Sequence, residues 1–125
     1  MSERNTTVTI SIDLKKYRLR IHKYTLGLLG IPNYVQLLVN PKGMQIALIG
    51  QETNTRDAHK VNLKCLQPDN SFELYSKALI VQLCRLVPGL DLGCTYRLTG
   101  TVLHNKTIAV FPLSTLQKIE GLEEQ

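Results

Sequence analysis

The chain has 125 residues, of which 43% are hydrophobic and 20% charged, with a formal net charge of +5. This composition is that of an ordinary globular protein and excludes a disordered chain. No apolar run approaches the roughly 20 residues of a membrane-spanning helix, and the N-terminus lacks the pattern of a signal peptide. We therefore expect a single cytoplasmic domain over residues 1–125, with no membrane partner.

The positive charge is confined to one half of the chain. Residues 1–60 hold nine Lys and Arg against four Asp and Glu, whereas residues 61–125 hold six of each. An anionic partner should therefore meet the first half.

Alternation of apolar and polar residues predicts the first extended element. Residues 8–13 predict a strand, and residues 15–22 continue the extended pattern. Because successive strand side chains point to opposite faces, Tyr17, Leu19 and Ile21 should lie on an inner face. The polar residues of the opposite face are Lys16, Arg18, Arg20 and His22.

A short helix and a hairpin complete the first half. The predicted segments are a helix over 24–30, a strand over 34–39, a turn over 40–43 and a returning strand over 44–49. Residues 8–50 therefore predict a basic β-α-β-β unit.

The same order of elements returns after a polar loop over residues 51–60. The predicted segments are a short strand over 61–63, a strand over 72–75, an amphipathic helix over 77–87, a strand over 95–102, a turn over 104–106, a strand over 107–111 and a helical turn in the tail from 114. Residues 61–113 therefore predict a second, neutral unit.

The matching order of the two halves predicts an internal duplication. Both returning strands also contain an Ile-Ala pair, Ile46-Ala47 and Ile108-Ala109. Because a half of this size cannot bury its apolar faces alone, the two units should pack on each other. The predicted fold is α+β: two β-α-β-β repeats packed as a pseudo-dimer, with a small barrel-like sheet and short helices.

Signatures of enzymes, metal sites and cofactor sites are absent from the sequence. It contains no Gly-rich phosphate loop, GxSxG, HExxH or CxxC motif. None of the histidines His22, His59 and His104 has a His or Cys partner at metal-ligand spacing. Three cysteines, Cys65, Cys84 and Cys94, suggest neither a disulfide framework nor a zinc site. We expect no enzymatic activity, cofactor or metal.

A cluster of basic residues is the sharpest functional feature. Five formal charges fall in nine residues without an intervening acid, and the basic residues are Lys15, Lys16, Arg18, Arg20, His22 and Lys23. Alternate side chains of a strand lie roughly 6–7 Å apart, a spacing comparable to that of phosphates along one DNA strand. The cluster therefore predicts binding to duplex DNA, and its arginines could read guanine in the major groove. A solvated strand face, charged to prevent edge pairing, is an equally weighted alternative.

Residues 18–31 resemble the AbrB-like (SpoVT/AbrB) family, which includes the AbrB regulators, the MazE antitoxins and the two-repeat MraZ proteins. Arg18, Ile21 and the Leu29-Gly30-Ile31 triplet match its signature, and residues 34–48 supply its hairpin. The sequence departs from the signature at several positions: His22 replaces its proline, and Leu26 and Gly27 replace its helix arginines.

The resemblance implies a swapped-hairpin barrel that binds DNA through basic strand and loop residues, with Arg18 as the matching position. Two units in one chain would supply internally the two-fold arrangement that AbrB-type proteins reach by dimerising. We therefore expect a DNA-binding transcriptional regulator. The alternative is a protein-interaction module, antitoxin-like or an assembly component, whose basic face serves an acidic partner. Homo-oligomerisation and a toxin-like partner stay open.

Overall fold

The computed structural model describes residues 6–103 and 107–119, so the predicted turn over 104–106 lies outside the described residues. The strands are β1 (Thr6–Asp13), β2 (Arg18–His22), β3 (Tyr34–Asn40), β4 (Gln45–Gln51), β5 (His59–Lys60), β6 (Ser71–Tyr75), β7 (Thr95–Val102), β8 (Ile108–Pro112) and β9 (Gln117–Ile119). The α-helices are α1 (Lys23–Leu28) and α2 (Lys77–Leu86), and single 3-10 turns span Leu63–Cys65 and Leu113–Thr115.

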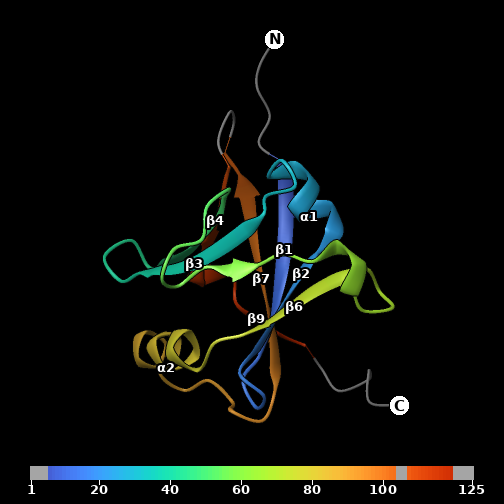
Figure 1. Ribbon diagram of the computed structural model, residues 1–125. Helices are drawn as coiled ribbons and strands as arrows, with labels where there is room; N and C mark the ends of the chain where they lie inside the picture. The colour runs from blue at the N-terminus through green and yellow to red at the C-terminus, as the bar shows by residue number, and fades with distance from the viewer. Residues whose placement is uncertain (1–5, 104–106, 120–125) are drawn as a thin grey trace.

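The strands form one antiparallel sheet that curls into a nearly closed barrel (Figure 1). Its order is β5-β3-β4-β8-β7-β1-β2-β6, and β9 adds to β7 beside this path. β1 lies between β2 and β7 and pairs with both. β6 pairs with the far side of β2, which brings residues 71–75 beside residues 18–22.

The core follows from the alternation of apolar side chains along these strands. In β1, Val8, Ile10 and Ile12 are buried, and in β2 Leu19 and Ile21 are completely buried. The outward-facing residues between them are polar, so one face of the sheet packs inside the barrel while the other meets solvent. Helix α2 adds Leu79, Ile80 and Leu83 to the same core, as the amphipathic pattern predicts.

Two side chains fix the starts of the helices. The hydroxyl of Ser76 accepts a hydrogen bond from the backbone N–H of Leu79 at 3.2 Å, which caps α2. His22 Nδ1 accepts one from the backbone N–H of Tyr24 at 3.0 Å, which caps α1. His22 therefore has a structural role at the end of the basic cluster.

The structure confirms both predicted helices and the strands expected near residues 8–13, 34–39, 44–49, 72–75, 95–102 and 107–111, with no bound shifted by more than two residues. The α+β class with a barrel-like sheet is also confirmed. In the described part of the chain, neither helix is long and apolar enough to cross a membrane.

The continuous extended segment predicted over residues 15–22 is wrong at its start. The Asp13 carboxylate accepts hydrogen bonds from the backbone N–H groups of Lys15 at 3.0 Å and Lys16 at 3.2 Å, which reverses the chain before β2. Tyr17 has a positive φ of 55° and is 38% exposed. The prediction that Tyr17 lies on the inner face is therefore wrong. Its ring lies at the surface, and the Lys77 ammonium is 5.6 Å from the ring centroid.

Two further elements differ from the predictions. The short strand expected over residues 61–63 is absent, and residues 59–60 of the predicted loop form β5, because their backbone pairs with Tyr34 and Val35 of β3. In the tail, the 3-10 turn is followed by β9, which pairs with β7. Both strands are short and depend on a neighbouring strand, so neither carries an alternating pattern of its own.

The Asp91 side chain links β9 to the loop before β7 through hydrogen bonds. Its carboxylate accepts hydrogen bonds from the backbone N–H of Gly93 at 3.0 Å and from the ammonium of Lys118 at 3.1 Å. The hydrogen bond from Gly93, followed by those from Cys94 and Lys118, lowers the pKa of Asp91 to about 2.

Replacing Asp91 with asparagine should produce a pH-dependent loss of stability. A carboxylate whose pKa is lower in the folded than in the unfolded protein stabilises the fold above its unfolded pKa of about 3.9, and this contribution disappears as pH falls through its folded pKa. Thermal midpoints of the wild type and Asp91→Asn should therefore differ between pH 5 and 7 and converge as pH falls from about 4 towards 2. A difference that stays constant over this range would show that the charge of Asp91 contributes nothing.

Candidate nucleic-acid interface

The structure places the predicted basic residues along one hairpin and the helix that follows it. Lys15 and Lys16 lie in the β1–β2 turn, Arg18, Arg20 and His22 lie in β2, and Lys23 begins α1. We call these six residues the basic hairpin. Arg18 and Arg20 lie on the same outward face of β2, as predicted, because Leu19 and Ile21 point into the core.

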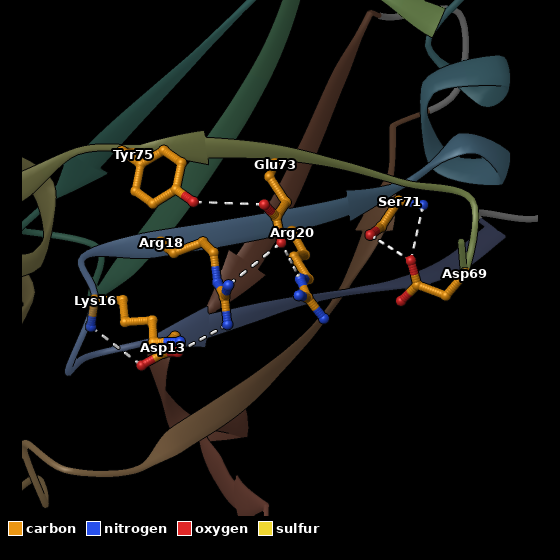
Figure 2. A network of polar contacts seen from close by, with 8 residues as sticks. All are labelled: Asp13, Lys16, Arg18, Arg20, Asp69, Ser71, Glu73 and Tyr75. Atoms are coloured by element: carbon orange, nitrogen blue, oxygen red, sulfur yellow. Dashed lines mark hydrogen bonds and ion pairs between the residues drawn. The ribbon is translucent and has the colours of Figure 1, made fainter. Parts of the chain in front are cut away.

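Two acidic residues from neighbouring strands contact these arginines (Figure 2). The Arg18 guanidinium lies 3.0 Å from the Asp13 carboxylate of β1 and 3.5 Å from the Glu73 carboxylate of β6. Arg20 Nε donates to the same Glu73 carboxylate at 2.6 Å. The acidic side chains are only 14% and 12% exposed, compared with 20% for Arg18 and 37% for Arg20. This network joins three adjacent strands through their outer face.

The network pairs two of the predicted basic residues with acids from other strands. Asp13 and Glu73 neutralise much of the charge of Arg18 and Arg20, so part of this charge serves the fold. Glu73 reaches the row because Arg20 and Glu73 are direct partners in the β2–β6 pairing. They are 53 residues apart in the chain, and no local feature of the sequence indicates the contact.

The lysines of the basic hairpin differ from its arginines. Lys15, Lys16 and Lys23 are exposed, and within residues 6–103 and 107–119 none of their ammonium groups forms an ion pair. Their charges are therefore available to an anionic partner.

Sequence reasoning missed one arginine of this surface. Arg97 of β7 is exposed and lies opposite Ser11 of β1, which on its other side lies opposite Arg20 of β2. Its outward position follows from the alternation of residues 95–102. The pairing of β7 with β1, which places Arg97 across from Arg20, could not be predicted, because it joins strands from the two halves of the chain.

These strands enclose a shallow hollow of about 360 Å³ on the outer face of the barrel. We call it the arginine hollow. Its lining residues are Ser11, Asp13, Arg18, Arg20, Thr95, Arg97 and Ile119.

A third acid lies near the network but is engaged locally. The Asp69 carboxylate accepts a hydrogen bond from the Ser71 hydroxyl at 2.6 Å. This hydrogen bond is the main cause of the lowered pKa of Asp69, and Arg20 makes a smaller contribution.

Among the residues that the structure describes, no three His, Cys, Asp or Glu side chains are grouped to hold a metal ion.

No family model, curated protein or solved structure matches this chain. No family assignment follows from these comparisons, and the AbrB-like resemblance of residues 18–48 remains a hypothesis.

Proposed function

We propose that this protein is a DNA-binding transcriptional regulator of AbrB-like type that binds duplex DNA, as a cytoplasmic protein, through the basic hairpin. The observation that carries the proposal is the exposure of Lys15, Lys16 and Lys23 without an acidic partner in the described chain. They lie before and after β2, so positive charge is exposed at both ends of this strand. Cations that contact phosphates neutralise them and release condensed counterions.

The arginines contribute less to this binding than the sequence alone suggests. Glu73 and Asp13 hold Arg18 and Arg20 in fixed positions, and a preorganised guanidinium loses less side-chain entropy when it binds an anion. The lysines therefore supply most of the unpaired charge, and the arginines supply rigid donors beside it.

An internal duplication is part of the proposal. Units β2-α1-β3-β4 and β6-α2-β7-β8 have the same order of elements. The first strands of the two units, β2 and β6, pair with each other, and so do the last strands, β4 and β8. The strand that precedes each unit pairs with the second strand of the other unit: β1 pairs with β7, and β5 pairs with β3. These pairings support a pseudo-dimer of two repeats, the arrangement that an AbrB-like two-repeat protein requires.

The DNA-binding proposal predicts a strongly salt-dependent affinity. Fluorescence anisotropy of a labelled duplex, followed at several salt concentrations, should show a steep loss of affinity with salt. A Lys15→Gln/Lys16→Gln/Lys23→Gln variant should bind about tenfold or more weakly at low salt, and its slope of log affinity against log salt should be shallower by roughly 2–3.

The matched control is Lys42→Gln/Lys60→Gln/Lys64→Gln, which removes three exposed charges outside the basic hairpin. It should keep most of the affinity. Equal losses in the two variants would show that net charge, and not the basic hairpin, drives binding. Failure of the wild type to bind duplex even at low salt would overturn the proposal.

A protein-interaction module is the second candidate. A hollow of about 430 Å³ lies between the β1–β2 turn and α2, and Tyr17, Val81 and Leu92 line it. These side chains are 38%, 36% and 62% exposed, and Lys15 and Arg85 supply positive charge beside them. Such a surface suits an acidic partner with apolar side chains. Stable co-purification with one protein, without DNA binding, would favour this candidate.

A further inference from the structure

We propose that the arginine hollow is an oxyanion-binding site that receives one phosphate group, with Arg20 and Arg97 as its principal donors. The proposal extends the DNA-binding function, and the identification of the phosphate as part of a nucleic-acid backbone rests on that function. It also assigns a binding role to the second half of the chain, because Arg97 belongs to β7.

The register of β2, β1 and β7 positions the residues of the site. Arg20, Ser11 and Arg97 form one row across β2, β1 and β7, so their side chains leave the sheet on the same face. Directly opposed residues of antiparallel strands have Cα atoms about 4.5–5.5 Å apart, which places the two arginine Cα atoms about 10 Å apart. Both side chains are long enough to converge over the small Ser11. A larger side chain at this position would fill the hollow.

The hydrogen-bond donors of the row are only partly used. Arg20 contacts Glu73 through Nε, and its two Nη groups have no acceptor among the described residues. The Arg97 guanidinium forms no ion pair or hydrogen bond within the described chain. The guanidinium groups of Arg20 and Arg97 therefore line the same hollow with free N–H donors. Planar guanidinium groups are suited to bidentate recognition of phosphate oxygens.

The second row of the hollow adds an unsatisfied donor. Arg18, Asp13 and Thr95 lie opposite one another across the same three strands. Arg18 Nε is buried and has no hydrogen-bond partner. A buried donor without an acceptor is unfavourable.

Charge also favours an anion in this hollow. Three guanidinium groups, those of Arg18, Arg20 and Arg97, line it, and two carboxylates, those of Asp13 and Glu73, pair with the first two. One positive charge is left over. The Asp13 carboxylate is already held by Arg18 and by two backbone N–H groups, which reduces its repulsion of an incoming anion. The hydroxyls of Ser11 and Thr95 can donate to further oxygens, as a tetrahedral phosphate requires.

The proposal is tested with inorganic pyrophosphate as the probe and with two arginine variants. Binding is followed by backbone amide chemical shifts at low salt in the wild type, Arg97→Gln and Arg56→Gln. Arg97 is exposed and unpaired in the described chain, so its loss should leave the fold intact. Arg56 is an exposed arginine between β4 and β5, outside the hollow, and controls for the loss of one positive charge.

Pyrophosphate should shift the amides of β1, β2 and β7, and Arg97→Gln should weaken its binding about tenfold, the effect of losing one charge-assisted interaction. Arg56→Gln should bind as the wild type does. Equal affinities of the two variants, or shifts confined to the lysines of the basic hairpin, would overturn the proposal.

A parallel titration with labelled duplex identifies the source of the phosphate. Weaker binding of both pyrophosphate and duplex by Arg97→Gln supports a backbone phosphate in the hollow. Weaker binding of pyrophosphate alone, with no duplex binding by the wild type, keeps the oxyanion site, assigns it to a small phosphorylated molecule and rejects the DNA-binding proposal. Duplex binding that depends on the hairpin lysines and is unaffected by Arg97→Gln rejects a backbone phosphate in the hollow and keeps the DNA-binding proposal.

Discussion

Replacement of Gly100 by alanine is expected to lower the thermal midpoint by about 10 °C or more, or to prevent folding. Gly100 lies in β7 where β8 crosses closest to it. A Cβ atom at this position would overlap the carbonyl oxygen of Val110 and approach Phe111 Cδ2 to 2.7 Å. Val110 cannot move away easily, because it pairs with Ala47 of β4 on its other side.

The size of this effect follows from the rigidity of the neighbours. Overpacking a core typically costs about 1–3 kcal/mol, and a clash with paired backbone, unlike one with the end of a flexible side chain, cannot be relieved by a change of rotamer. Phe111 is also completely buried, so its ring has no free space to enter. Gly100 is therefore required by the close approach of two strands.

Gly27→Ala is the matched control. Gly27 lies in α1, is exposed, and would have no atom within 4 Å of an added Cβ. Because alanine favours a helix over glycine by roughly 1 kcal/mol, this variant should be as stable as the wild type or slightly more so. Circular dichroism melts of the two variants test the prediction. Similar midpoints for both would contradict the close packing of β7 on β8.

The sequence predicts those parts of the fold whose signal is local. The alternating residues of β1 and β7 and the amphipathic pattern of α2 lie within short windows, and all three elements are where they were expected. The turn between β1 and β2 also has a local signal that the prediction overlooked. Buried positions fall on even numbers from Val8 to Leu14 and on odd numbers at Leu19 and Ile21, and such a change of phase interrupts a single strand.

The candidate site depends more on pairing between distant strands. The clustering of the basic residues is visible in the sequence, but the ion pairs of Arg18 and Arg20 with Glu73 require β6 to lie beside β2. The convergence of Arg97 on Arg20 likewise requires β7 to lie beside β1. No spacing in one sequence specifies such registers, which arise when the whole sheet closes around its core.

Glu73→Gln should reduce stability and increase affinity for duplex DNA. Glutamine keeps the size of the side chain and removes the negative charge that holds Arg20 at 2.6 Å and Arg18 at 3.5 Å. Removing one partner of a fully buried pair costs about 3–5 kcal/mol, and the partial exposure of both arginines reduces the expected loss to about 1–3 kcal/mol. Urea denaturation measures this loss.

The gain in affinity has a separate cause. Without the Glu73 charge, the arginine hollow has two uncompensated guanidinium groups instead of one, so a phosphate there should be bound several-fold more tightly at low salt. Glu52→Gln is the control: it removes an equal charge from an exposed side chain that accepts a hydrogen bond from Asn33 at 2.8 Å and lies outside the arginine hollow. Anisotropy titrations of both variants against duplex separate a local from a global effect of charge.

The two readouts of Glu73→Gln distinguish a binding role of the network from a purely structural one. If the arginines serve only to join β1, β2 and β6, the variant loses stability and binds duplex no better than Glu52→Gln does. If they also face a phosphate, the same substitution that weakens the fold strengthens binding. In that case the network has to balance fold stability against anion binding, and Glu73 would affect both, because its carboxylate contacts both Arg18 and Arg20 across the β2–β6 pairing.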